Sequence, residues 1–307
     1  MSFDLLQNKI REKKNPTAAG LDPRADYIPP HIREACLKEY GETLKAEAEA
    51  AYLFTCGLMD ALCDIVPAVK PQSAFYEMLG WQGMEVLERT IRYAKEKNFF
   101  VILDGKRGDI GSTAEAYSAA FLGEVSVGSQ TYRPFPCDAL TINAYLGSDG
   151  IQPFLHDSLA HDTCFFALVK TSNASSGELQ DLVAGDRLVY RVVGDLLERL
   201  GRGLEGKYGF TPLGAVVGAT YPSDLHQLRR RLEHTFFLVP GYGAQGGSAA
   251  DVRYAFNKLG HGAIVNSSRG IMCAWQHTGK NGLDYQDAAR NAAIAMREDI
   301  RNYVTVV

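Results

Sequence analysis

The chain has 307 residues, of which 46% are hydrophobic and 22% are charged. Its 32 basic and 36 acidic residues give a net charge of −4, which implies no strongly basic surface and argues against a nucleic-acid partner. The longest apolar runs, such as 164–169, fall far below the ~18 residues that a membrane-spanning helix needs, so no membrane partner is expected.

Eight short apolar runs recur along the chain and are predicted to be β-strands. Each run is nearly continuous in apolar residues rather than alternating, which is typical of strands buried on both faces of a parallel sheet. The predicted strands cover residues 17–22, 67–72, 100–105, 139–145, 164–172, 213–220, 235–243 and 262–270.

Segments with helical periodicity lie between these runs. A capping box at 112–115 (STAE) predicts where one of these helices starts. The interval 173–212 is longer than one crossover requires, and it is predicted to hold an extra helix or a mobile lid. The predicted helices cover residues 33–66, 83–97, 114–125, 190–200, 223–232, 248–259 and 284–303.

Eight strands that alternate with helices predict a (β/α)8 barrel. An open, doubly wound parallel sheet is the alternative architecture. Because no low-complexity linker divides the sequence, residues 1–307 are expected to form a single domain with extra helical insertions.

The densest group of charges, 104–109 (DGKRGD), directly follows the third apolar run. Residues two apart on a strand share a side, so Asp104 and Lys106 are expected to face the barrel interior together. Asp109 lies one turn further on, and Lys70 ends the preceding strand. An exposed surface turn is the alternative interpretation. A buried ion network costs desolvation energy that function would justify, so we favour an alternating array of two lysines and two aspartates.

A glycine-rich turn, 240–248 (PGYGAQGGS), follows the seventh apolar run and precedes a predicted helix. Backbone N–H groups at a helix N-terminus suit a phosphate group. The eighth run ends close to Arg269, whose guanidinium can bind two phosphate oxygens at once. Loops after strands 7 and 8 are the usual phosphate site of such barrels, so we favour a phosphate site over a flexible glycine-rich loop.

Several other chemistries find no support. The seven histidines include no H-x-x-x-H or H-E-x-x-H pair, so no metal is expected, and no G-x-S-x-G motif supports serine hydrolysis. The glycine turn lacks the G-K-[ST] of a P-loop and the partner acid of a dinucleotide site, so no nucleotide cofactor is expected. The six cysteines include no C-x-x-C pair, and the N-terminal segment has no signal-peptide core, which favours a cytoplasmic protein with reduced thiols.

Six short motifs occur in order between residues 20 and 270: 20–22 (GLD), 69–77 (VKPQSAFYE), 104–110 (DGKRGDI) with Thr113, 170–173 (KTSN), 240–247 (PGYGAQGG) and 268–270 (SRG). In this order they resemble the orotidine 5′-phosphate decarboxylase family, in its longer bacterial branch. The D-x-K-x-x-D-I core is shared with sugar-phosphate relatives and indicates a superfamily. The lysine on the preceding strand, the glycine loop with its glutamine and the terminal arginine make the resemblance specific.

The resemblance implies decarboxylation of orotidine 5′-phosphate to UMP and CO2 without a cofactor, the last step of UMP synthesis. It implies that Lys106 donates the proton to C6, while Lys70, Asp104 and Asp109 complete the charged array. Two other functions stay open: a metal-dependent sugar-phosphate lyase or synthase of the same superfamily, and a non-catalytic nucleotide-binding barrel.

The resemblance also implies how the nucleotide is bound. Asp22 and Thr113 would bind ribose hydroxyls, and Ser172 the amide edge of the pyrimidine, although Thr171 or Asn173 could take that role. Gln245 and Arg269 would bind the phosphate. In the family, the residues that match Asp109 and Thr113 reach the neighbouring subunit's site, which implies a homodimer with shared active sites.

Overall fold

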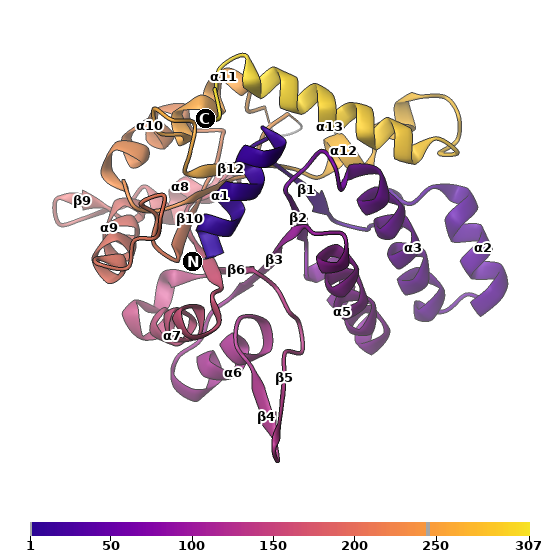
Figure 1. The fold of residues 1–307 in the computed structure, drawn as a ribbon, viewed down its shortest axis with the longest axis horizontal. Coiled ribbons are helices and arrows are strands. Elements are labelled where there is room, and N and C mark those ends of the chain that lie inside the picture. The colour runs from indigo at the N-terminus through magenta and orange to yellow at the C-terminus, as the bar shows by residue number, and fades with distance from the viewer. Residues whose placement is uncertain (1, 244–245) are drawn as a thin grey trace.

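The computed structural model describes residues 2–243 and 246–307. Parallel strands close into a barrel in which each strand lies beside the strands that precede and follow it in this set (Figure 1). The (β/α)8 barrel is therefore confirmed, and the open doubly wound sheet is wrong. The barrel strands are β1 (Thr17–Leu21), β2 (Ala68–Pro71), β3 (Phe100–Arg107), β6 (Ala139–Ile142), β7 (Cys164–Lys170), β10 (Leu213–Val217), β11 (Phe237–Val239) and β12 (Ala263–Ser267).

The barrel strands are buried on both faces, which explains their continuous apolar sequences. In β3, Phe100 and Ile102 belong to a cluster inside the barrel, whereas Val101 and Leu103 belong to the larger cluster that includes the surrounding helices. Helix α1 (Ser2–Lys13), which the sequence pattern did not predict, adds Phe3 to the inner cluster. This helix therefore covers the end of the barrel where the strands begin.

Most of the longer helices surround the barrel where helical periodicity predicted them (Figure 1). The predicted helix over 33–66 is two helices, because Gly41 takes a φ of +69° and breaks the run. The predicted helix over 248–259 shortens to α11 (Ala249–Val252) and the 3-10 turn η4 (Arg253–Ala255). The other helices are α2 (Pro30–Tyr40), α3 (Leu44–Leu62), α4 (Ala74–Glu77), α5 (Gly80–Glu96), α6 (Gly111–Phe121), α7 (Gln152–His161), α9 (Val189–Gly201), α10 (Pro222–Arg231), α12 (Arg269–Met272) and α13 (Tyr285–Arg301). Short 3-10 turns are η1 (Ala144–Leu146), η2 (Ser148–Gly150) and η5 (Ala274–His277).

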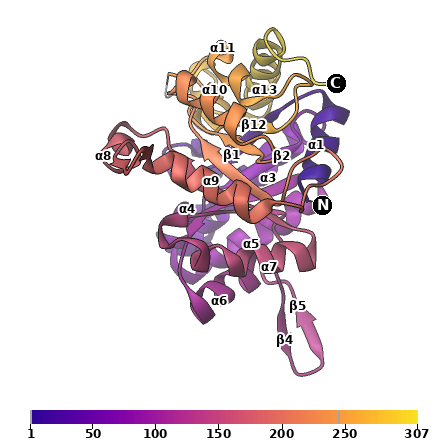
Figure 2. The ribbon, with the colours of Figure 1, turned by 90° about the vertical axis from the view of Figure 1, so that its left-hand side faces the viewer.

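The capping box predicted at 112–115 is wrong. Helix α6 begins at Gly111, and Ile110 is its N-cap without a side-chain hydrogen bond. The chain leaves β3 early enough that Ser112 and Thr113 already lie within the first helical turn. Beyond α6, β4 (Val125–Val127) and β5 (Gln130–Tyr132) form an antiparallel hairpin that projects from the barrel (Figures 1 and 2).

The long interval 173–212 contains the extra helix that its length predicted. Before α9 it forms the 3-10 turn η3 (Ala174–Ser176), the short helix α8 (Gly177–Gln180) and a hairpin of β8 (Val183–Ala184) with β9 (Arg187–Leu188). Across the described part of the chain, no helix is long and apolar enough to span a membrane.

Candidate active site

An ion network lies where β2 and β3 reach the rim of the barrel. Lys70 Nζ lies 2.7 Å from Asp104 Oδ2, and Lys106 Nζ lies 2.6 Å from Asp104 Oδ1. Thr141 of β6 also donates its hydroxyl to Asp104 Oδ1, at 2.9 Å. The side chains of Lys70 and Asp104 are 6% and 11% exposed, whereas that of Lys106 is 48% exposed. One carboxylate thus holds two ammonium groups, and the side chain of Lys106 is the one that reaches solvent.

The backbone that carries Lys106 is irregular. Pairing with β6 advances by four residues on β3, from Leu103 to Arg107, while β6 advances by two. Lys106 takes a φ of +45°, and its N–H donates to Thr141 Oγ1 at 2.9 Å. A left-handed backbone costs roughly 1–3 kcal/mol at residues other than glycine and is concentrated at functional sites. The predicted neighbourhood of Asp104 and Lys106 therefore arises from a bulge, not from regular strand alternation.

The charges of the network control its protonation. Burial by itself raises the pKa of Asp104, but the charges of Lys70 and Lys106 outweigh burial and hold this pKa well below its usual range. Burial also opposes the charged form of Lys70, yet Asp104 and Asp22 raise the pKa of Lys70 above its ordinary value. Asp104 and Lys70 therefore both stay ionised at neutral pH.

The chain brings three members of the predicted four-residue array together. Asp109 is half-buried, and its Oδ1 accepts a hydrogen bond from Ile110 N at 2.8 Å. Within the described residues, its carboxylate does not contact Lys70 or Lys106. Thr113 is exposed on the first turn of α6. Asp109 and Thr113 therefore lie at the rim, outside the ion network of their own chain.

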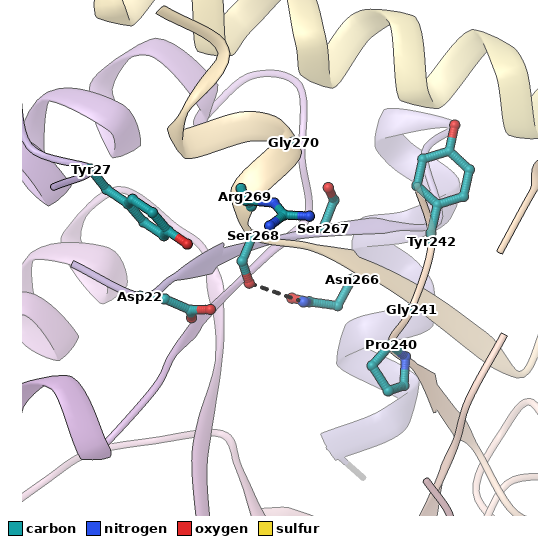
Figure 3. Close-up of a pocket in the computed structure, with 10 residues that line it drawn as sticks. All are labelled: Asp22, Tyr27, Pro240, Gly241, Tyr242, Asn266, Ser267, Ser268, Arg269 and Gly270. Carbon is teal, nitrogen blue, oxygen red and sulfur yellow. Dashed lines mark hydrogen bonds between the residues drawn. The ribbon is translucent and has the colours of Figure 1, made fainter. Parts of the chain in front are cut away.

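A cavity of about 250 Å³ lies between the ends of β1, β11 and β12 (Figure 3). Asp22 and Tyr27 line one side of it, and both side chains point toward Ser268. In the described part of the chain, Asp22 Oδ1 is buried without a hydrogen-bond partner. Such an acceptor suits a ligand hydroxyl. Tyr27 was not predicted, because it lies in an insertion whose path the local sequence does not indicate.

Arg269 lines the same cavity, at the first residue of α12. Gln245, the other residue predicted to bind phosphate, lies outside the described residues. The helix behind the glycine turn does not offer the expected N-terminus, because Ser248 and Asp251 form a capping box there. Of the two residues predicted to bind phosphate, the structure therefore places Arg269 at the cavity.

Residues 171–173 follow β7 at the rim. Thr171 donates its hydroxyl to Asn173 Oδ1 at 2.7 Å, and Asn173 Nδ2 donates to Ser175 Oγ at 3.1 Å. Ser172 packs closely on Gly218, the residue after β10, because a Cβ atom at Gly218 would come within 2.9 Å of Ser172 Cα. Thr171 and Asn173 are therefore bonded to each other and to the insertion, while Ser172 lies against Gly218.

Two further features of the described residues concern their cysteines and their possible metal ligands. All six cysteines are free thiols. No group of three or more His, Cys, Asp or Glu side chains in the described ranges is arranged to hold a metal ion.

The barrel, its two-lysine ion network and the adjoining polar cavity define a (β/α)8-barrel protein with an enzyme-like site at the carboxyl ends of its strands. The model of the Orotidine 5′-phosphate decarboxylase / HUMPS family matches residues 54–278. The chain therefore belongs to the orotidine 5′-phosphate decarboxylase family, and the resemblance noted in its motifs is confirmed.

Relatives with this name match nearly the whole chain. The orotidine 5′-phosphate decarboxylase of Rhodopirellula baltica is 43% identical over 290 residues, which cover 93% of this chain and 94% of that protein. The Clostridium perfringens enzyme is 38% identical over 306 residues, which cover 99% of each. Among solved structures, the OMP decarboxylase of Leishmania donovani has a TM-score of 0.73 at 32% identity and covers 98% of each chain. A putative orotidine 5′-phosphate decarboxylase from Streptomyces avermitilis has a TM-score of 0.78 at 31% identity and covers 99% of this chain and 95% of its own.

Proposed function

We propose that this chain is a carboxy-lyase that converts orotidine 5′-phosphate to UMP and CO2 without a cofactor, in pyrimidine biosynthesis. The observation that carries the proposal is the buried carboxylate of Asp104 between two ammonium groups, one of which belongs to a half-exposed side chain. Membership of the family, with relatives that bear this activity in their names, supports it.

The chemical problem is the electron pair that CO2 leaves on C6 of the pyrimidine. When the C6–carboxylate bond breaks, both bonding electrons stay on C6, and the ammonium of Lys106 stabilises this negative charge. A proton then passes from Lys106 Nζ to C6, which gives UMP and a neutral amine that regains its proton from water. Asp104 holds Lys106 in place through a 2.6 Å contact, and Lys70 holds Asp104. These contacts are made by the chain's own side chains, which is the fixed arrangement of charge that electrostatic catalysis requires.

The simplest test of this function follows the ultraviolet absorbance of orotidine 5′-phosphate with purified protein and EDTA. We expect the spectrum to change to that of UMP at a rate that the chelator does not alter. Activity lost to EDTA would indicate the metal-dependent sugar-phosphate lyase or synthase instead. Nucleotide binding without a spectral change would indicate the non-catalytic barrel.

For the substrate, we propose that Asp22 binds the ribose, as an acceptor for its hydroxyls, together with Thr113. Ser172 is our choice for the pyrimidine edge, as the resemblance implies, with Thr171 or Asn173 as the alternatives. Arg269 and Gln245 are proposed to bind the phosphate. The buried, unpartnered Oδ1 of Asp22 supports the first of these assignments.

Replacement of Arg269 by alanine is expected to raise KM for orotidine 5′-phosphate by about 10- to 100-fold, the equivalent of one charge-assisted hydrogen-bond pair. The measurement compares inhibition by UMP with inhibition by uridine, which lacks the phosphate. Uridine should bind both proteins equally. The matched control is Arg92→Ala, whose side chain is 51% exposed on α5. Equal weakening of UMP and uridine would argue against the phosphate site.

We further propose a homodimer in which Asp109 and Thr113 enter the neighbouring subunit's site. Their position outside their own chain's ion network supports this arrangement. Lys70→Ala and Asp109→Ala homodimers should each be nearly inactive. A 1:1 mixture that exchanges subunits should regain about one quarter of full activity, because half of the dimers are mixed and each has one intact site.

The control mixture combines Lys70→Ala with Lys106→Ala subunits. These residues belong to the same chain's network, so every site stays defective and no recovery is expected. Recovery in the control, or its absence in exchanged Lys70→Ala and Asp109→Ala dimers, would contradict shared sites.

The six free cysteines support a cytoplasmic location, where thiols stay reduced.

A further inference from the structure

A lysine that the proposed mechanism does not use lies at the end of β7, directly before residues 171–173. The side chain of Lys170 is fully buried, and it pairs with Asp181, whose side chain is 44% exposed. The rings of Tyr221 and Tyr190 lie 4.5 Å and 5.3 Å from its Nζ. A buried ammonium group is stable only when an opposite charge and other polar contacts replace water. Asp181 provides this charge from the insertion.

An irregularity in β7 directs Lys170 toward the insertion. Pairing with β10 passes from Leu168 to Lys170 on β7, while β10 advances by a single residue. Val169 is therefore an extra residue in the strand. The side chain of Lys170 consequently reaches Tyr190 of α9, on the helix side of the barrel.

The same short segment contacts the end of β7 at a second point. Gln180 Oε1 accepts a hydrogen bond from Thr171 N at 2.9 Å, and Gln180 Nε2 donates to Thr171 Oγ1 at 2.7 Å. Consecutive residues of the insertion, Gln180 and Asp181, thus bind consecutive residues at the strand end. Figure 2 shows α8 on the opposite side of the barrel from α1. Because α1 covers the end where the strands begin, α8 lies on the side of the other end, where β2 and β3 carry the ion network.

We propose that Asp181 and Gln180 are positioning residues that determine specificity for the pyrimidine end of the substrate, because they hold the turn of residues 171–173 in place. This inference rests on the proposed function, in which Ser172 binds the pyrimidine. Arg269 lies at the end of β12, with β10 and β11 between it and β7. Loss of the Lys170–Asp181 pair should therefore affect recognition of the base and leave recognition of the phosphate unchanged.

The test measures competitive inhibition by UMP and by ribose 5-phosphate, which has no base. In Asp181→Asn, the inhibition constant for UMP should rise about tenfold, a loss typical of one misplaced polar contact, while that for ribose 5-phosphate stays within about twofold. Gln180→Ala should likewise raise the inhibition constant for UMP and leave that for ribose 5-phosphate within about twofold. The matched control is Asp186→Asn in the adjacent hairpin, where the aspartate side chain is 93% exposed and both constants should stay unchanged.

A second variant separates positioning from the cost of an unpaired buried charge. In Lys170→Met/Asp181→Asn no ammonium is left buried, so the protein should keep its thermal midpoint, while discrimination between UMP and ribose 5-phosphate stays reduced. Equal weakening of both ligands in Asp181→Asn, no weakening of either, or restored discrimination in the double variant would each overturn the inference. Failure of the unsubstituted protein to decarboxylate orotidine 5′-phosphate would overturn the proposed function, whereas the ratio of the two constants tests the positioning role by itself.

Discussion

Replacement of Lys106 by alanine is expected to lower kcat for orotidine 5′-phosphate by about 10⁵-fold. The variant loses a proton donor, which contributes ~10²–10⁴-fold, and a charge aimed at the developing carbanion, which contributes ~10²–10³-fold. The affinity for UMP should change little, because UMP carries no charge at C6 that would need the ammonium. Single-turnover kinetics together with UMP inhibition measure the two effects separately.

Two further variants test whether positive charge alone is sufficient and whether the effect is specific to Lys106. Lys106→Arg keeps a positive charge but cannot release its proton, so it should recover at most a small part of the lost rate. Lys97→Ala removes a lysine whose side chain is 36% exposed and paired with Asp60, and it should leave kcat unchanged. Turnover near the normal rate in Lys106→Ala would contradict the proposed mechanism.

Replacement of Asp104 by asparagine is expected to abolish activity and to destabilise the fold. The change leaves the ammonium of Lys70, 6% exposed, without its carboxylate. Removal of one partner from a buried ion pair typically lowers the free energy of unfolding by ~3–5 kcal/mol. Asp60→Asn is the control, because Asp60 is 41% exposed and such surface pairs contribute only ~0–1 kcal/mol. Urea unfolding of the unsubstituted protein, Asp104→Asn and Asp60→Asn measures the difference. A smaller loss of unfolding free energy in Asp104→Asn than in Asp60→Asn would contradict the buried network.

The pH dependence of this difference follows from the two pKa shifts. The pKa of Asp104 is lowered in the fold, so its stabilisation is complete above its ordinary value of 3.8 and is lost as pH falls through the lower folded value. The pKa of Lys70 is raised, so its stabilisation is complete below the ordinary 10.5 and is lost as pH rises through the higher folded value. The stability gap between the unsubstituted protein and Asp104→Asn should therefore be constant near neutral pH and narrow in strong acid. A gap that widened in acid would show that Asp104 is not the charged partner.

Local sequence was sufficient for the buried parallel strands, although the same pattern also fitted an open doubly wound sheet. A strand covered on both faces must be apolar at consecutive positions, so each strand carries its own signal, whatever its neighbours are. The polar residues at the ends of these strands were also predictable as neighbours, because the carboxyl ends of parallel strands meet at one rim. Lys70 and Asp104 were therefore expected to be neighbours, and their atoms lie 2.7 Å apart.

Features that depend on contacts between distant residues were not predictable. The capping box at 112–115 satisfied the local pattern, yet the path from β3 set the start of α6 at Gly111. Tyr27 reaches the cavity because an insertion folds back toward β12. No periodicity in the sequence of that insertion predicts this path. Lys170 stands in an apolar run, and its pairing with Asp181 depends on a bulge in β7.

The order of residues along the chain determined which charged groups this protein has, on which strands they lie and therefore at which end of the barrel they meet. The tertiary structure decided which ammonium group is enclosed and which is accessible. Lys70 is enclosed by the strands on either side of it, while the bulge at Lys106, held by Thr141 from the next strand, leaves that side chain 48% exposed. Burial and backbone strain are properties of packed neighbours from several strands, so no single stretch of sequence contains them.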